Sequence, residues 1–492
     1  MRKALLVLTL TAGMALGLPE GIAASPATSQ PGKPKPPNVI LILVDDLGWS
    51  DLACYGSDLH ETLHLDKLAR QGVRFTDAYS ASPVCSPTRA GLLTGKHPAR
   101  LGMTIWREGA LSPPRNRRLL PAAAVADLPH AETTLAESLQ SAGYLTALVG
   151  KWHLGDADHA PETHGFDVNI GGTHWGAPAT FFSPYRGSFG QARERRYVPH
   201  LELGKPGEYL TDRLTDEALR VIDHAKARDR PFFLYLAHHA PHTPIEAKPE
   251  LVKRYEKKIT PKSRHRNPAY AAMIHSLDES VGRIVERIEK LGLTERTVIL
   301  LVSDNGGYVG TYEGKTVANN GSLRSGKGSL YEGGVRVPLI VAWPGVTPSG
   351  AVCREPVVST DLYWTILDVT GCKVKEPPKG ERDGQSLVPL LKDVKASLGR
   401  DALYWHYPHY YATTTPVSAI RAGDWKLLEY HEDSRVELYH LKDDLGETKD
   451  LAAKMTDKSE ELLRGLRAWR KGVNARMPTP NPEFKRKDKE SP

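Results

Sequence analysis

The sequence has few cysteines and, beyond its first residues, no long apolar run. Four cysteines in 492 residues are too few to make the chain a disulfide scaffold, although Cys353 and Cys372 are candidates for one bridge. No later apolar stretch approaches the roughly 20 residues that span a bilayer, so no membrane-spanning segment is expected. The sequence also lacks zinc-finger spacing, a long basic helix and a basic stripe with interleaved aromatic residues. These absences argue against a nucleic-acid-binding protein.

The N-terminus has the pattern of a secretory signal peptide. Two basic residues precede an apolar run from Ala4 to Leu18, and small residues surround a cleavage point predicted after Ala24. We therefore predict a signal peptide over residues 1–24 and a periplasmic or secreted protein. The Pro-rich stretch 25–37 cannot build a core and is interpreted as a leader. The formal net charge of +7 is small, and residues 477–492 are predicted to be a charged, solvated tail.

Residues 38–371 alternate between strand and helix patterns. The clearest helix covers Ala269–Leu291, where apolar residues recur at steps of three and four. Continuous apolar runs rich in branched residues predict strands that are covered on both faces, namely Asn38–Val44, Leu145–Val149, Phe232–Ala237, Thr297–Val302 and Val335–Ala342. The alternation predicts an α/β catalytic domain over residues 38–371, built on a large, mostly parallel sheet sandwiched by helices.

The texture changes after about Gly371, where the predicted elements become short. Four aromatic or alternating segments predict strands, namely Ala402–Tyr407, Val417–Arg421, Asp424–Tyr430 and Val436–Leu441. A helical pattern follows from Asp457 to Val473. We therefore predict a C-terminal α+β subdomain over residues 372–476, with a small antiparallel sheet and one packing helix.

The most informative segment is Cys85–Gly95, which reads C-S-P-T-R-A-G-L-L-T-G. It places a cysteine where a strand passes into a helix, a position that faces ligands and backbone N–H groups. A lone cysteine is more often a small buried apolar residue. The whole string, however, resembles the signature of the type I sulfatases of the alkaline phosphatase superfamily. The resemblance implies that a formylglycine-generating enzyme oxidises Cys85 to formylglycine, and that Pro87 and Arg89 complete the motif.

Polar residues follow two of the predicted strands. Asp45 and Asp46 come after the first strand, and Asp304 and Asn305 come after the fourth. Either pair alone is a common turn former. Because ligands bind at the carboxyl ends of parallel strands, the two pairs together indicate a metal site whose oxygen ligands suit Ca²⁺ or Mg²⁺ better than Zn²⁺. The resemblance assigns all four residues to one Ca²⁺ that also touches the formylglycine at Cys85.

Three further strings carry basic residues. G-K-W-H-L-G contains Lys151 and His153, whose spacing of two places both side chains on one face of an extended segment. P-H-T-P contains His242, and G-K-G-S-L-Y-E-G-G contains Lys327. The strings are similar to those of sulfatases. The resemblance makes Lys151 a sulfate clamp and His153 the base that releases sulfate, and it makes His242 and Lys327 the proton donors to the leaving group.

Substrate identity depends on weaker signals. Residues 164–176 resemble those of bacterial polysaccharide sulfatases, especially enzymes for galactose or N-acetylgalactosamine sulfates. We expect His174 and Trp175 to bind the sugar, with Arg324 and His406 reaching the same pocket. Two alternatives stay open: a phosphate or phosphonate monoester hydrolase of the same superfamily, and a non-catalytic protein that binds sulfated glycans.

Overall fold

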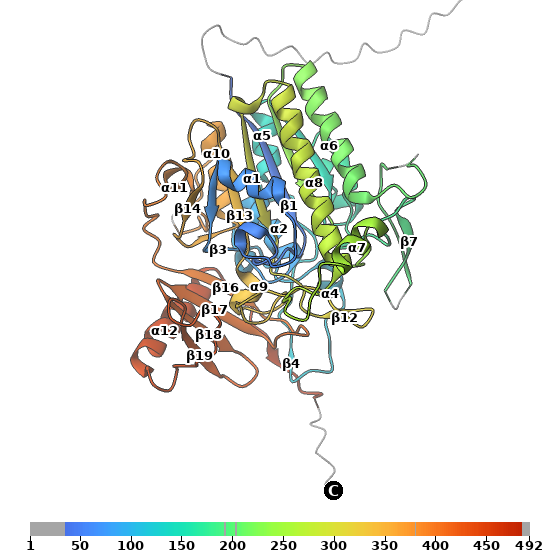
Figure 1. The fold of residues 1–492 in the computed structure, drawn as a ribbon. Coiled ribbons are helices and arrows are strands. Elements are labelled where there is room, and N and C mark those ends of the chain that lie inside the picture. The colour runs from blue at the N-terminus through green and yellow to red at the C-terminus, as the bar shows by residue number, and fades with distance from the viewer. Residues whose placement is uncertain (1–34, 191–192, 202–203, 379, 485–492) are drawn as a thin grey trace, which may run out of the picture. The chain divides into compact units, whose positions relative to one another are not determined.

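The computed structural model describes residues 35–190, 193–201, 204–378 and 380–484. The predicted signal peptide, most of the leader and the end of the predicted tail lie outside these ranges. Residues from Pro36 onward form one compact unit that contains a large sheet and a small sheet (Figure 1). Among the described residues, no helix combines the length and apolar character needed to cross a membrane.

The large sheet has eight strands in the order β14-β2-β13-β10-β1-β9-β5-β6. Strand β13 alone is antiparallel to the other seven strands, so the prediction of a mostly parallel sheet is confirmed. The strands are β1 (Asn38–Val44), β2 (Val73–Phe75), β5 (Leu145–Gly150), β6 (Val168–Ile170), β9 (Phe232–Ala237), β10 (Thr297–Ser303), β13 (Leu339–Ala342) and β14 (Ala351–Cys353).

One predicted strand is shorter than expected. The apolar run Val335–Ala342 enters the sheet only at Leu339, because Glu332–Val335 closes a helical turn, α9. Pro338 lies between the two elements and has no N–H to donate to a sheet ladder.

Helices cover both faces of the large sheet. Alternate residues of β1 face opposite sides: Val39, Leu41 and Leu43 pack in one core, and Ile40, Ile42 and Val44 pack in the other. The first core includes α2 (Cys85–Thr94), α5 (Leu135–Ser141) and α10 (Asp361–Thr370), and the second includes α1 (Leu63–Gln71), α6 (Leu210–Ala227) and α8 (Pro268–Lys290). Helix α8 confirms the predicted helix, and the side chain of Asn267 caps it by accepting from the N–H groups of Ala269 and Tyr270.

The small sheet is antiparallel, as predicted, and one of its faces packs on α12 (Thr456–Gly472). Its strands are β16 (Leu403–Tyr407), β17 (Val417–Ala422), β18 (Trp425–Tyr430) and β19 (Val436–His440). The other face packs against Tyr79, Leu330 and Tyr331 of the larger part. Helix α11 (Val388–Lys392) falls in the predicted C-terminal subdomain by sequence, but its apolar residues pack in a core of the large sheet.

Shorter elements complete the chain. They are β3 (Ala78–Tyr79), α3 (Pro98–Leu101), α4 (Arg107–Leu111), β4 (Leu119–Leu120), β7 (Arg186–Phe189), β8 (Glu194–Tyr197), α7 (Pro249–Glu256), β11 (Thr311–Tyr312), β12 (Lys315–Thr316), β15 (Val357–Val358) and β20 (Thr479–Pro480).

Candidate active site

The predicted catalytic and metal-binding residues meet where the central strands of the large sheet end. Strands β10, β1, β9 and β5 are neighbours that run in the same direction, so the residues after Ser303, Val44, Ala237 and Gly150 emerge at one edge. This is the edge at which parallel sheets bind ligands. Strands β1 and β10, which are distant in sequence, thus bring Asp45 and Asp46 together with Asp304 and Asn305.

Three carboxylates and three cationic side chains fill this edge. Arg89 donates from Nε and Nη2 to Oδ2 of Asp304 at 3.0 and 2.8 Å. Lys151 Nζ donates to Oδ2 of Asp45 at 2.7 Å, and all four of these side chains are fully buried. The third pair, Lys327 and Asp46, has Nζ 2.7 Å from Oδ1. Buried charges persist only when they are paired in this way.

The charge balance sets the protonation of these carboxyl groups. Burial alone would raise the pKa of Asp46, but the ammonium of Lys327 and the ring of His242 outweigh it and lower the pKa to about 2. Burial raises the pKa of Asp304, and the negative charge of Asp45 adds to the effect against Arg89. A further cation beside Asp45 and Asp304 would therefore be favourable.

The oxygen atoms of this edge fit a hard cation. Asn305 is buried, and its Nδ2 donates to Oδ1 of Asp46 at 2.8 Å. Its Oδ1 accepts no hydrogen bond from any described residue, which leaves a buried acceptor in need of a partner. Ligand atoms of Asp45, Asp46, Cys85 and His242 lie within 4.8 Å of one another. Carboxylate and amide oxygens in such a cluster suit Ca²⁺ or Mg²⁺.

Cys85 lies beside these charges, at the first position of α2. Its Sγ is 3.4 Å from Oδ1 of Asp45 and 3.3 Å from Nζ of Lys327. Burial, together with the charge of Asp304, raises the pKa of the Cys85 thiol to about 12 despite the two lysines. The unmodified thiol would therefore stay neutral near pH 7 and would be a poor nucleophile.

Two histidines approach Cys85 from different strand ends. His242 follows β9, and its Nε2 lies 3.7 Å from Oδ2 of Asp46. Burial and the charge of Lys327 lower the pKa of His242 to about 3. His153 follows β5 with a φ of 60°, a left-handed conformation that is costly for residues other than glycine. A Cβ on Gly176 would lie 2.4 Å from the His153 ring, so only glycine allows this contact.

Neighbouring histidines have supporting positions. His238 Nε2 lies 3.0 Å from Oγ of Ser280 inside the fold. His239 is buried, and neither of its ring nitrogens has a hydrogen-bond partner among the described residues. Burial and the charges of Lys151 and Arg89 hold its pKa well below the usual range. His239 is therefore a neutral ring near pH 7.

A cavity of about 260 Å³ opens onto these groups. Its wall includes Cys85, His153, His242 and Lys327, together with residues that the sequence did not reveal: Trp106, Glu108, Phe189, Arg196 and Tyr411. These additions come from three separate loop and hairpin segments that carry no recognisable motif. No pattern within one sequence could have assigned them to the site.

The predicted sugar-binding residues separate in the structure. His174 and Trp175 directly precede Gly176 and Ala177, which line the cavity, and the two rings pack at 4.7 Å. Arg324 lies in an adjoining groove instead. His406 is buried in the small sheet, where its ring nitrogens lie 2.7 Å from Ser418 Oγ and 2.9 Å from the Arg476 carbonyl oxygen. The structure therefore does not bring His406 to the cavity, because both its nitrogens serve packing elsewhere.

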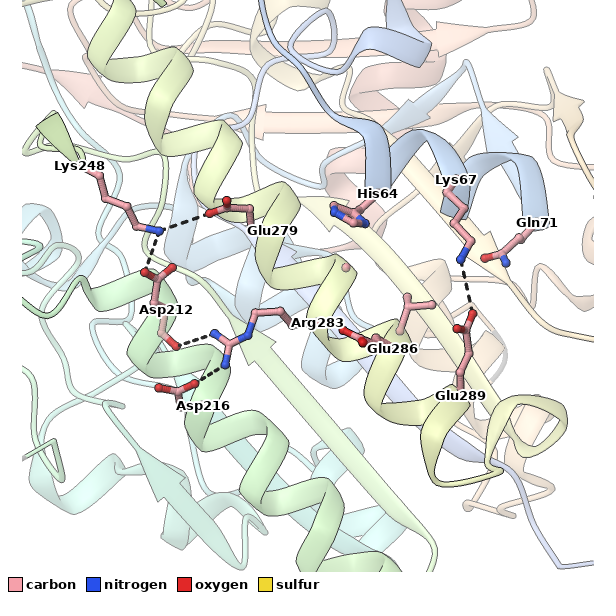
Figure 2. Close-up of a pocket in the computed structure, with 12 residues that line it drawn as sticks. His64, Lys67, Gln71, Asp212, Asp216, Lys248, Glu279, Arg283, Glu286 and Glu289 are labelled. Atoms are coloured by element: carbon pink, nitrogen blue, oxygen red, sulfur yellow. Dashed lines mark hydrogen bonds and ion pairs between the residues drawn. The ribbon is translucent and has the colours of Figure 1, made fainter. Parts of the chain in front are cut away.

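A larger surface groove lies between α1, α6 and α8, away from these residues (Figure 2). Its three cationic side chains are all paired with carboxylates: Lys248 contacts Asp212 and Glu279, Arg283 contacts Asp216, and Lys67 contacts Glu289. It contains none of the predicted site residues.

A comparison with known protein families decides the assignment. The family model described as Sulfatase matches residues 37–372. The chain belongs to the sulfatase family. A second model, for the C-terminal part of N-sulphoglucosamine sulphohydrolase, matches residues 325–471. The alkaline-phosphatase-like fold and the sulfuric ester hydrolase class predicted from the sequence are thereby confirmed.

Several sulfatases are similar over most of this chain. A protein named Sulfatase from Formosa agariphila is 33% identical over 522 aligned residues, covering 91% of this chain and 92% of that protein. Human arylsulfatase A is 34% identical over 472 residues, covering 88% and 87%. N-acetylgalactosamine-6-sulfatase of Canis lupus familiaris is 36% identical over 375 residues, covering 73% and 67%.

Solved structures of the same fold include enzymes with other names. The structure of Ps i-CgsB in complex with k-i-k-neocarrahexaose superposes with a TM-score of 0.73 at 30% identity, covering 92% of this chain and 95% of that chain. Phosphonate monoester hydrolase of Agrobacterium radiobacter superposes with a TM-score of 0.65 at 20% identity, covering 89% and 96%. The second likeness shows the fold alone.

Proposed function

We propose that this sulfatase hydrolyses sulfate esters of polysaccharide-derived sugars through a formylglycine made from Cys85, with Ca²⁺ as its metal. The observation that carries the proposal is the position of Cys85, whose Sγ lies 3.4 Å from Oδ1 of Asp45 and 3.3 Å from Nζ of Lys327. The formylglycine, once formed, would supply a geminal hydroxyl as nucleophile, and Ca²⁺, once bound, would supply a divalent positive charge for the sulfuryl oxygens. The family has this chemistry, and the residues needed for both groups are present.

Asp45, Asp46, Asp304 and Asn305 would hold the Ca²⁺. The chain's own cations then act on the sulfate. Lys151 and Lys327 offer fixed positive charge in a buried site, where it stabilises the charge that spreads over the sulfuryl oxygens in the transition state. Arg89 orients Asp304 through two charge-assisted hydrogen bonds to one carboxylate oxygen, Oδ2.

Proton transfer falls to Lys327 and the two histidines. Burial opposes the charge on Lys327, but Asp46 and Cys85 raise its pKa well above the usual range, so it carries a proton and can assist His242 in protonating the leaving oxygen. The negative charge of a bound sulfate ester favours the protonated form of His242, which then donates to the leaving oxygen as general acid. His153, neutral and with Nδ1 free of any described partner, takes the proton whose loss releases sulfate.

The favoured substrate is a galactose or N-acetylgalactosamine sulfate. Segment 164–176 carries this preference, since His174 and Trp175 adjoin the cavity through Gly176. Two similar proteins support it by their printed names, the N-acetylgalactosamine-6-sulfatase and Ps i-CgsB, whose structure contains k-i-k-neocarrahexaose. A periplasmic or secreted location fits such polymers, which are too large to import.

The test is a rate assay with protein matured by a formylglycine-generating enzyme. We expect hydrolysis of an aryl sulfate to exceed hydrolysis of the matching aryl phosphate, and sulfate release from galacto-configured sugars. Peptide mass analysis should show that the Cys85 thiol is lost, and Cys85→Ala should be inactive. A fully active Cys85→Ala variant contradicts the nucleophile, and a preference for the aryl phosphate contradicts the reaction.

The metal is tested separately. A chelator should abolish activity, and Ca²⁺ should restore it, because every expected ligand is an oxygen atom. Stoichiometric zinc without calcium in active protein contradicts this part of the proposal and leaves the sulfatase assignment unchanged.

A further inference from the structure

A second groove adjoins the active-site cavity and carries an unusual number of arginines. It has a volume of about 560 Å³. Four guanidinium groups line it, those of Arg117, Arg118, Arg324 and Arg435, against a single lining carboxylate, Glu432. Four tyrosines also line it, Tyr331, Tyr410, Tyr411 and Tyr430, together with the threonines of residues 413–415.

Tyr411 joins this groove to the active site. It lines both cavities, and its ring packs edge-on against Trp106 at 5.9 Å. A Cβ on Gly328 would lie 2.0 Å from the Tyr411 ring, so the ring contacts the backbone next to Lys327. Thr413, another residue of the groove, donates to the carbonyl oxygen of Lys327 at 2.8 Å. The loop that carries Tyr411 and Thr413 therefore contacts both the Lys327 segment and the groove.

The arginines are only partly neutralised within the protein. Arg435 pairs with Glu437, and Arg324 stacks 3.8 Å over the Tyr331 ring and donates to the Glu447 carbonyl oxygen. Within the described ranges, Arg117 and Arg118 pair with no carboxylate. Both are exposed, and Arg117 lies 5.4 Å over the Tyr410 ring.

Such a surface suits a ligand that carries a planar carboxylate or a tetrahedral sulfate group. Guanidinium groups bind sulfate and carboxylate through paired N–H donors. The tyrosine rings add flat faces and hydroxyl groups, which match a sugar ring. Two like charges on adjacent residues repel each other, and an anion between them removes that repulsion.

We propose that this groove, which we call the arginine groove, binds an anionic group on the sugar unit next to the one that loses its sulfate. The inference rests on the proposed function, because it places the hydrolysed sulfate at Lys327. The enzyme would then recognise a second negative charge on its substrate, carried by a sulfate ester or a uronate carboxylate. The groove would favour oligosaccharides over single sugars. Arg117 and Arg118 are the specificity-determining residues, and Arg324 belongs to this groove rather than to the catalytic cavity.

The experiment compares disaccharide binding in a Cys85→Ala background, which prevents turnover during the titration. Three disaccharides share a galactose sulfate, and their second sugars carry a sulfate, a carboxylate or no charge. Dissociation constants are measured by calorimetry with Ca²⁺ present. We expect Arg117→Ala/Arg118→Ala to weaken the two anionic probes by about ten- to hundredfold, the loss typical of one or two charge-assisted contacts. The uncharged probe should change less than twofold.

The control is Arg115→Ala, since Arg115 is an exposed arginine of the same segment that does not line the groove. It should leave all three constants unchanged. The anionic probe that binds with the lower dissociation constant identifies whether the groove prefers a sulfate or a carboxylate. Equal losses for charged and uncharged probes, or no loss for any, overturn the proposal.

Sulfate release by the parent enzyme is assayed in parallel. If the parent releases no sulfate from any sugar, the proposed function fails, whereas unchanged binding in the double variant is a failure of the arginine groove alone. Higher salt should also weaken the binding of the anionic probes to the parent more than their binding to the double variant, because screening acts on exposed charges.

Discussion

Replacing Lys151 by Met tests the charge balance of the active site most directly. The Nζ atom of Lys151 lies 2.7 Å from Oδ2 of Asp45, and both side chains have no exposed surface. Met has nearly the same length but no charge, so the variant leaves Asp45 buried without this partner. Removing one member of a buried ion pair costs about 3–5 kcal/mol of unfolding free energy.

The metal changes that cost in a predictable way. Ca²⁺ bound by Asp45 would replace part of the lost positive charge, so the destabilisation should be larger in a chelator than in excess Ca²⁺. Guanidinium unfolding of parent and variant under both conditions measures this difference. A matched control is Lys96→Met, whose partner Glu132 lies 2.5 Å away at the surface, and which should cost about 1 kcal/mol or less.

Activity should fall further than stability explains. If Lys151 stabilises charge on the sulfuryl oxygens, its loss should lower kcat for an aryl sulfate by roughly 10²–10³-fold, as for the loss of one preorganised donor. The assay is steady-state hydrolysis at saturating Ca²⁺, below the temperature at which the variant begins to unfold. A kcat within about threefold of the parent would refute the clamp role.

Three further predictions concern other parts of the fold. Lys426→Met should lower the unfolding free energy by about 3–5 kcal/mol, because Lys426 Nζ pairs with buried Glu332 at 2.7 Å. The measurement is unfolding in denaturant, and an unchanged midpoint of that transition contradicts the pairing. Gly328→Ala should lower the rate with an aryl sulfate, since φ is +88° and a Cβ would meet the Tyr411 ring; full activity would show that this loop moves freely. Burial lowers the pKa of His409 to about 3. The contribution of the neutral ring to stability is therefore complete above the unfolded pKa of about 6.5 and is lost as pH falls toward 3, at no more than about 1.4 kcal/mol per pH unit. His409→Gln should flatten the dependence of unfolding free energy on pH in this range, and an identical slope would show that His409 does not cause it.

The sequence by itself determined the elements that follow from local patterns. Continuous apolar runs predicted β1 and β9 to the residue, because a strand buried on both faces consists mostly of apolar side chains. The aspartates at the ends of β1 and β10 were predicted to meet because parallel strands present their carboxyl ends at one edge. Motif resemblance supplied Cys85 and the basic residues around it.

Only the tertiary structure decided which loops complete the site. Trp106, Arg196 and Tyr411 reach the cavity from segments that are distant in sequence, and their positions depend on how the small sheet and the β7–β8 hairpin pack. The sequence predicted both Arg324 and His406 to bind the sugar. In the structure Arg324 lines a groove, whereas two hydrogen bonds hold the His406 ring inside the small sheet. A residue's type shows what chemistry it can perform, whereas packing determines what it can reach.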